Sequence, residues 1–247
     1  MITIKDQAGF DRMAMAAKAV VAVHEQVRAA LAPGVRLREL DAIAAEVIRA
    51  HDCTPSFLGY HGYPASICAS PNSTIVHGIP DKYRLREGDI ISIDAGAIYQ
   101  GFHADAAFTA GVGELDAEAA RLIEVTEQAL LAGIAAVRPG ARTGDVGHAV
   151  QQVVEAAGFS VVREYVGHGI GHAMHEEPQI PNYGRPHSGV RLKAGMAICI
   201  EPMVNVGDFQ TKLQDDGWTV VTADGSRSAH FEHTVAITDQ GAWVLTG

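Results

Sequence analysis

The chain repeats itself, and this internal similarity constrains its fold more than any other feature. Residues 31–36 read Leu-Ala-Pro-Gly-Val-Arg, and residues 137–142 read Val-Arg-Pro-Gly-Ala-Arg. Each Pro-Gly pair follows an Ala-rich run with helical apolar spacing and precedes a second amphipathic stretch. Each half therefore predicts a helix, a Pro-Gly turn and another helix. The expected helices span residues 13–31, 40–50, 120–137 and 146–157.

The similarity resumes where each half predicts a short strand that ends in an acid. A turn and a β-branched run lead to Asp94 in the first half and to Glu201 in the second. An acid at the end of a strand usually lies in solvent. A solvent-exposed role, however, does not explain why an acid stands at the end of the corresponding strand in both halves. Each half then offers another acid within a strand, Asp105 and Glu232. If two such units pack about a pseudo-twofold axis, the four carboxylates converge.

No linker or low-complexity segment separates the halves, so we expect one domain over residues 1–247, duplicated at about 7–115 and 116–247. The formal net charge is −10 and no dense run of Lys or Arg occurs, which argues against a specific nucleic-acid binder. The three cysteines lack the spacing of a disulfide framework, as is typical of a reducing compartment. No secretory signal and no apolar run of about 18 residues occur, so we expect a cytoplasmic protein without a membrane span.

Four acids in one buried site require compensating charge. Two like charges about 4 Å apart repel by about 4 kcal/mol at an effective dielectric constant of about 20. Two divalent cations would offset four carboxylates, and a neutral imidazole would complete the ligand set. His168 is the candidate, because the glycines on both sides of it permit close backbone approach. Such an oxygen-rich site with one imidazole suits manganese, iron, cobalt or zinc. Taken singly, an acid is usually a surface charge and a histidine usually a hydrogen-bonded core residue.

Eight short motifs follow one another along the chain. They are Gly-Tyr-His-Gly-Tyr-Pro at 59–64, His-Gly-Ile-Pro at 77–80, Ile-Asp at 93–94, Gly-Phe-His-Ala-Asp at 101–105, Gly-His-Gly-Ile-Gly at 167–171, His-Glu-Glu-Pro at 175–178, Ile-Glu-Pro-Met at 200–203 and Phe-Glu-His-Thr at 231–234. In this order and spacing the chain resembles the type I methionine aminopeptidases over nearly its whole length. The resemblance implies an α+β pita-bread (creatinase/aminopeptidase) fold, in which two pseudo-twofold-related helix-helix-sheet halves surround a central, mostly antiparallel sheet.

The resemblance also implies a metal-dependent aminopeptidase that removes the initiator methionine from nascent proteins. It makes five residues the ligands of two divalent metal ions: Asp94, Asp105, His168, Glu201 and Glu232. A water or hydroxide between the metals would attack the scissile carbonyl, with Glu201 as acid and base. His175 would stabilise the tetrahedral intermediate, and His77 would position the scissile amide.

The same resemblance assigns a substrate pocket and partners. The wall of the methionine pocket would consist of Tyr60, Tyr63, Cys68, Met174 and Trp218. Such soft and apolar groups suit a thioether. A monovalent cation would bind near Asn72 and Ser228. The partners would be the N-terminal methionine peptides of nascent chains, with transient ribosome association, and the protein would be a monomer.

The sequence departs from the family pattern at two places, and two rival functions remain. Ala106 stands where a hydroxyl-bearing residue is usual, so a supporting hydrogen bond at the metal site is expected to be missing. Met174 stands where an aromatic residue is common, which would loosen the pocket. One rival is a proline-specific (Xaa-Pro) peptidase on the same fold, whose members generally carry an extra N-terminal domain. The other is a non-catalytic pita-bread binding protein, which would usually have lost metal ligands. The bulky Ile2 indicates that this protein keeps its own Met1.

Overall fold

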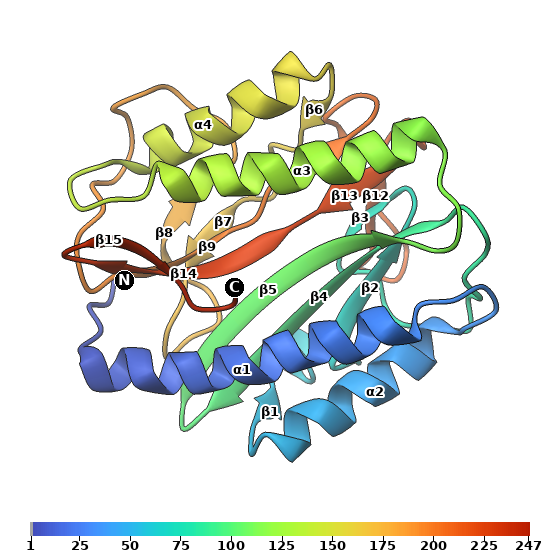
Figure 1. Ribbon diagram of the computed structural model, residues 1–247, viewed down its shortest axis with the longest axis horizontal. Coiled ribbons are helices and arrows are strands. Elements are labelled where there is room, and N and C mark those ends of the chain that lie inside the picture. The colour runs from blue at the N-terminus through green and yellow to red at the C-terminus, as the bar shows by residue number, and fades with distance from the viewer. Residues whose placement is uncertain (1) are drawn as a thin grey trace.

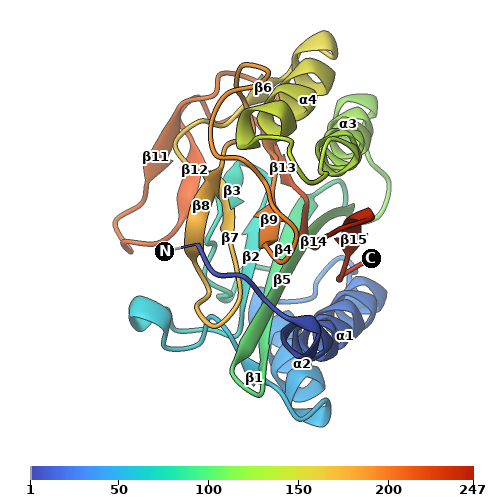
Figure 2. The same cartoon turned by 90° about the vertical axis from the view of Figure 1, so that its left-hand side faces the viewer.

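Two pairs of helices flank one large sheet in residues 2–247, which the computed structural model describes (Figure 1). Helix α1 (Gln7–Ala30) packs against α2 (Leu37–Ala50), and α3 (Ala117–Ala135) packs against α4 (Thr143–Ala156). The two pairs lie toward opposite ends of the sheet and on the same side of it (Figure 2). Each half thus contains the helix, turn and helix that its sequence predicts. The expectation about Met1 lies outside the described residues.

The first helix begins earlier than the apolar spacing alone indicates. The carboxylate of Asp6 accepts a hydrogen bond from the backbone N–H of Gly9 at 2.8 Å, which caps the helix and starts it at Gln7. Helix α2 likewise begins before the expected residue 40, because the Glu39 side chain accepts from the Arg36 backbone N–H at 3.0 Å. Polar residues that fall outside an apolar stripe therefore extend both helices.

The strands are mostly short, except for two long ones in the first half. Their bounds are β1 Thr54–Pro55, β2 Ile67–Pro71, β3 Thr74–Val76, β4 Ile90–Tyr99, β5 Phe102–Gly111, β6 Ser160–Val161, β7 Gly167–Gly169, β8 Glu176–Ile180, β9 Ala197–Ile200, β10 Met203–Asn205, β11 Thr211–Leu213, β12 Val220–Thr222, β13 Ser228–His230, β14 Glu232–Thr238 and β15 Gly241–Val244. A single 3-10 turn covers Tyr60–Gly62. No helix within residues 2–247 combines the length and the apolar character needed to cross a bilayer.

A nine-stranded sheet forms the centre of the molecule. Its strands follow the order β1-β4-β5-β14-β9-β7-β8, with β2 also paired to β4 and β15 to β14. All of these pairs are antiparallel. Strands β5 and β14 join the two halves of the chain at the middle of this sheet. The mixed α+β architecture with an antiparallel-rich sheet agrees with the fold class expected from the sequence.

The Pro-Gly turns of the two halves make the same backbone contacts. The N–H of Gly34 donates to Leu85 O at 2.7 Å, and the N–H of Gly140 donates to Leu192 O at 2.9 Å. Isolated antiparallel bridges then join Arg36 to Arg84 and Arg142 to Arg191. Each turn therefore fastens a helix pair to the loop that enters the acid-bearing strand of its own half.

Candidate active site

Five neighbouring strands carry the five residues expected to bind metal. Asp94 lies on β4, Asp105 on β5, Glu232 at the start of β14 and His168 on β7, while Glu201 directly follows β9. These strands are adjacent in the sheet order β4-β5-β14-β9-β7. All five side chains line one cavity of about 180 Å³. The sheet therefore brings together acids that are far apart in the sequence.

The position of Asp94 differs from the sequence expectation. The β-branched run was expected to end at this acid, but β4 continues to Tyr99. The continuation reads Ala-Gly-Ala-Ile-Tyr, and each of its residues pairs with β5 in the antiparallel register, Gly96 with Asp105. A Cβ at Gly96 would lie 2.8 Å from the Ser56 side chain, so the glycine allows Ser56 to pack closely against the strand here.

The glycines beside His168 allow the close backbone approach that the sequence predicts. A Cβ at Gly167 would lie 2.3 Å from Cys199 O, and one at Gly169 would lie 2.2 Å from Glu177 O. The Nδ1 atom of His168 lies 2.9 Å from the backbone carbonyl of Gly169, which can only accept, so Nδ1 carries the proton. The Nε2 atom is left free and lies 3.5 Å from Glu201 Oε1. Burial lowers the pKa of His168 to about 3, so the ring is neutral.

Burial raises the pKa values of all four acids, and repulsion between carboxylates adds to this for three of them. Asp105 and Glu232 are almost fully buried, whereas Asp94 and Glu201 keep some exposure to the cavity. Burial raises the pKa of Asp94 to about 7. It also raises the pKa values of Asp105, Glu201 and Glu232 well above their ordinary range, with a further rise from the neighbouring carboxylates. The cluster therefore favours protons or metal cations over bare negative charge.

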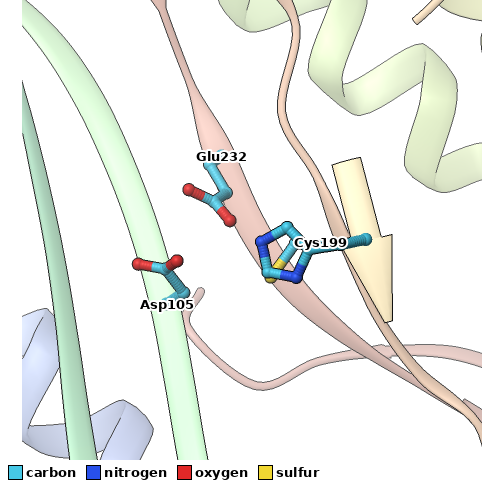
Figure 3. A group of neighbouring side chains, drawn as sticks. Asp105, Cys199 and Glu232 are labelled. Carbon is cyan, nitrogen blue, oxygen red and sulfur yellow. The ribbon is translucent and has the colours of Figure 1, made fainter. Parts of the chain in front are cut away.

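The oxygen atoms of this cluster lack hydrogen-bond partners. Asp94 Oδ1, Asp105 Oδ1 and Glu232 Oε1 are buried and accept no hydrogen bond from residues 2–247. Leaving a buried acceptor unsatisfied costs about 1–3 kcal/mol, and more for a charged group, so such atoms usually have a partner. Figure 3 shows the Asp105 and Glu232 carboxylates facing each other from β5 and β14. Unpaired carboxylate oxygens beside a free imidazole nitrogen fit divalent cations.

Two buried side chains join the site without having been expected there. Cys199 contributes a sulfur atom to a group with Asp105, His168 and Glu232, whose potential ligand atoms all lie within 4.8 Å of one another (Figure 3). Burial raises the pKa of its thiol, so it stays protonated. The sequence could have indicated Cys199, because it stands two residues before Glu201 and alternate residues of an extended segment point to the same face. The second side chain is His230, whose Nε2 lies 3.9 Å from Glu201 Oε2.

Ala106 was expected to leave the metal site without a supporting hydrogen bond, and its methyl group offers none. Thr234, on neighbouring β14, contacts the backbone of Asp105 instead. Its hydroxyl accepts from the Asp105 N–H at 2.9 Å and donates to the Asp105 carbonyl at 2.7 Å. The strand that carries the acid is therefore fixed through its main chain, while Oδ1 stays unpaired.

Two histidines expected to act in catalysis line the same cavity. The ring of His175 lies 4.3 Å from that of His168, between centroids, and its Nδ1 lies 2.7 Å from the Tyr60 hydroxyl. Burial lowers the pKa of His175, and it lowers that of His77 to about 4. Both rings are therefore neutral at physiological pH. His77 also makes an edge contact with Tyr165, at 5.8 Å between ring centroids.

The expected pocket wall is a compact apolar cluster beside the acids. Its buried members are Phe57, Tyr63, Ala65, Cys68 and Met174, with Tyr60, Ile79 and Trp218 packed against them. All five residues predicted for this wall line the cavity. Cavity residues that the sequence did not indicate are Phe57, Val76, Tyr165, Val166, Met203 and His230. The pair expected near a monovalent cation lies outside it, where the Ser228 N–H donates to Asn72 O at 2.9 Å.

Comparisons with known proteins agree with this geometry. A family model described as metallopeptidase family M24 matches residues 11–239. A methionine aminopeptidase of Clostridium perfringens is 49% identical, over 100% of this chain and 99% of the relative. The crystal structure of methionine aminopeptidase from Thermotoga maritima matches with a TM-score of 0.98 at 47% identity, covering 100% of this chain and 99% of that one. Prolidase from Pyrococcus furiosus has a TM-score of 0.80 at 22% identity and is covered over 65% of its length, which indicates the fold alone.

Proposed function

Because this chain belongs to metallopeptidase family M24, with the pita-bread fold and full-length similarity to methionine aminopeptidases, we propose that it removes the N-terminal methionine from newly made proteins. The observation that carries this proposal is the convergence of four carboxylates and one imidazole against an apolar cavity. Similar proteins over the whole length carry the methionine aminopeptidase name, whereas the similarity to a prolidase extends only to the fold. The proline-specific alternative is therefore not favoured.

The donor set fits two divalent cations such as manganese, iron, cobalt or zinc. The residues that would hold them are Asp94, Asp105, His168, Glu201 and Glu232. Their unpaired oxygens and the free Nε2 of His168 support this assignment. When bound, such ions make water a stronger acid and polarise a scissile carbonyl.

Glu201 is suited to move a proton. Its Oε1 and Oε2 atoms face the imidazoles of His168 and His230, and part of the carboxyl group stays open to the cavity. A carboxylate in this place would accept a proton from the attacking water and then deliver it to the departing amine. Without cations, burial and the neighbouring carboxylates raise the pKa of Glu201, and bound cations would favour its ionised form, which is the form that accepts a proton.

His175 is suited to stabilise negative charge on the carbonyl oxygen. The pKa of Tyr60 is raised by burial, so its hydroxyl keeps its proton and would donate to His175 Nδ1. That hydrogen bond leaves the proton of the neutral ring on Nε2, as a donor toward the substrate. Loss of one such donor typically costs about 10²-fold or more in rate. His77, also neutral and in the cavity, would hold the scissile amide.

The substrate orientation follows from the two surfaces of the cavity. The acids would attract the free amino group of a peptide, which favours an exopeptidase. The wall formed by Tyr63, Cys68 and Met174 would receive the thioether, because soft and polarisable groups contact sulfur favourably.

Several further properties belong to the same proposal. The chain would act in the cytoplasm as a single catalytic domain, and as a monomer with transient ribosome contact. Its three cysteines are free, which supports a reducing compartment. The matching contacts of Gly34 and Gly140 support duplicated halves at about 7–115 and 116–247. A monovalent cation would bind near Asn72 and Ser228.

The proposed function is tested by a peptidase assay across metals. Protein loaded with manganese or cobalt is expected to release methionine from Met-Ala-Ser, while Leu-Ala-Ser serves as the control for side-chain selection. Met-Pro-Ser is assayed in parallel. Release only from the proline peptide would indicate the Xaa-Pro activity, and a metal-loaded protein that cleaves neither peptide would be a binding protein.

A further inference from the structure

An N-terminal arm, residues 2–5, runs along one edge of the central sheet before the Asp6 cap of α1. Figure 2 shows it passing from the β8 side of the molecule to the start of α1. Ile2 makes a parallel bridge to Glu177 of β8, the last strand in the sheet order. An edge strand presents unpaired backbone groups, and the arm covers part of this edge. Strand β8 begins at Glu176, immediately after His175.

Glu176 is the point at which the arm is fastened. The Lys5 ammonium donates to Glu176 Oε2 at 2.8 Å, and the Thr3 hydroxyl donates to the same oxygen. Its Oε1 accepts from the Ala173 N–H at 3.3 Å. The side chains of Lys5 and Glu176 are 4% and 5% exposed, whereas the Arg227–Asp116 pair is 30% and 55% exposed. A buried pair of this kind is costly to break, because the remaining charge loses its partner.

The arm also contacts the segment that carries His175 and the turn that leads to Glu201. A Cβ at Gly171 would lie 2.4 Å from Lys5 Cε, so the lysine stem lies directly on this glycine. The Lys5 N–H donates to Gly195 O at 2.7 Å, in the turn before β9. One residue of the arm thus contacts both segments that lead to the cavity.

The opposite side of the segment 171–176 is fixed by the β4–β5 hairpin. The His103 N–H donates to Gly171 O at 2.8 Å, and His172 Nδ1 donates to Gly101 O at 2.9 Å. His175 itself lines the cavity while part of its surface remains open to solvent, and the hydroxyl of Tyr60 holds its ring there. The backbone that carries His175 is therefore held by the hairpin at Gly171 and His172 and by the arm at the next residue, Glu176.

We propose that Lys5 and Thr3 are positioning residues, which act through Glu176 to hold His175 where it can donate to the substrate. The inference rests on the proposed function, because it assigns this role within the same site. Neither side chain lines the cavity. A displacement of a catalytic group by about 1 Å can cost about 10²-fold in rate. Loss of an anchor one residue away from the donor His175 is therefore expected to lower kcat.

The first test removes the anchor without changing the cavity. Thr3→Val and Lys5→Met are each expected to lower kcat for Met-Ala-Ser by about 10-fold, with less than about a twofold change in KM, because the substrate-binding surface remains. Thr3→Ser keeps the hydroxyl and is expected to keep kcat within about twofold. Arg121→Met is the control, since Arg121 joins α3 to Ala157 O far from the cavity and should change stability without changing kcat.

The second test asks whether the effect passes through His175. In a His175→Ala background, Lys5→Met is expected to cost less than about twofold more, because the group that the arm positions is gone. An equal cost in both backgrounds would mean a general structural role and would overturn the inference. An unchanged kcat in Thr3→Val would also overturn the inference. The Thr3 variant therefore decides the test even if Lys5→Met fails to fold.

Amide hydrogen exchange separates this inference from the proposed function. In Thr3→Val the amides of residues 171–177 should exchange faster than in the parent protein, while those of α3 stay the same. If the parent protein released no methionine, the proposed function would fail and exchange alone would decide whether the arm orders this segment. Unchanged exchange in 171–177 would overturn the inference.

Discussion

The hydrogen bond between Tyr60 and His175 links the apolar wall of the cavity to its polar end. It joins a pocket residue to a ring that lies against His168. A neutral imidazole has one donor and one acceptor nitrogen, so a tyrosine that donates to Nδ1 keeps the proton of the ring on Nε2. Tyr60 and His175 belong to separate sequence motifs, but the hydrogen bond between them makes the protonation of His175 depend on Tyr60.

Replacing His175 with Ala is expected to lower kcat by about 10²-fold or more while metal content stays the same. The reason is that the ring would donate to the developing oxyanion and is not among the proposed ligands. Turnover of Met-Ala-Ser and metal analysis of the same sample provide the measurement. Tyr60→Phe should give a smaller loss, since the ring remains but its tautomer is no longer fixed. Full activity in His175→Ala would remove this residue from the mechanism.

At the scale of the elements, short polar contacts fix where each helix and strand begins. Asp6 starts α1, and the same helix packs its buried stripe of Met13, Val20 and Val27 against the sheet. Strand β4 continues past Asp94 because residues 95–99 pair with β5, and Gly96 leaves room for the neighbouring Ser56 side chain. Local hydrogen bonds and close packing decide boundaries that periodicity leaves open.

Asp6→Ala is expected to lower the free energy of unfolding by about 1 kcal/mol, because one N-terminal amide of α1 loses its partner. Urea unfolding followed by circular dichroism measures the change. Asp11→Ala, which removes an exposed carboxylate on the same helix, is the control and should have little effect. A loss no larger than that of the control would show that the cap contributes nothing to stability.

At the scale of the whole molecule, the cluster of four acids and one histidine joins the two halves of the chain. Asp94 and Asp105 come from the first half, and His168, Glu201 and Glu232 from the second. Without cations, four carboxyl groups of raised pKa and several buried neutral histidines share one interior. Cations would replace the protons on these acids and stabilise the packing of the halves.

Metal-free protein is expected to lose stability as the pH rises from about 7 to about 8.5. In this range the unfolded chain has already released its carboxyl protons, whereas the folded state still holds protons on Asp105, Glu201 and Glu232, whose pKa values are raised well above their ordinary range, and loses the rest of its proton on Asp94, whose pKa is about 7. The folded state then binds more protons, so the free energy of unfolding falls with pH. Below about pH 6.5 unfolded histidines take up protons that the buried rings of His24, His77, His168 and His230 do not, so this contribution to the free energy of unfolding opposes that of the acids.

Thermal unfolding in chelator, with and without manganese, measures this dependence. The rise in Tm caused by manganese should be larger at about pH 8.5 than at about pH 6.5, because the competing protons are fewer. Asp94→Asn with Glu232→Gln is the control and should flatten the pH dependence in chelator. A metal-free Tm that rises between pH 7 and 8.5 would contradict the raised pKa values.

Much of the architecture follows from the sequence by itself. The Pro-Gly turns with helical periodicity on both sides predict the paired helices, since apolar spacing depends only on the local repeat of the backbone. The recurrence of Asp94 and Glu201 after β-branched runs predicts converging acids. The order and spacing of the motifs, from the Gly-Tyr-His-Gly-Tyr-Pro segment onward, indicate the family.

Other features are decided only by the tertiary structure. The entry of Cys199 and His230 into the site, the support of Asp105 by Thr234 and the fastening of Glu176 by Lys5 all join residues that no local pattern connects. The physical reason is that such contacts depend on which strands are neighbours and in what register they pair. A strand's own periodicity shows which face a side chain occupies, but the partner that it meets there is determined by the folded sheet.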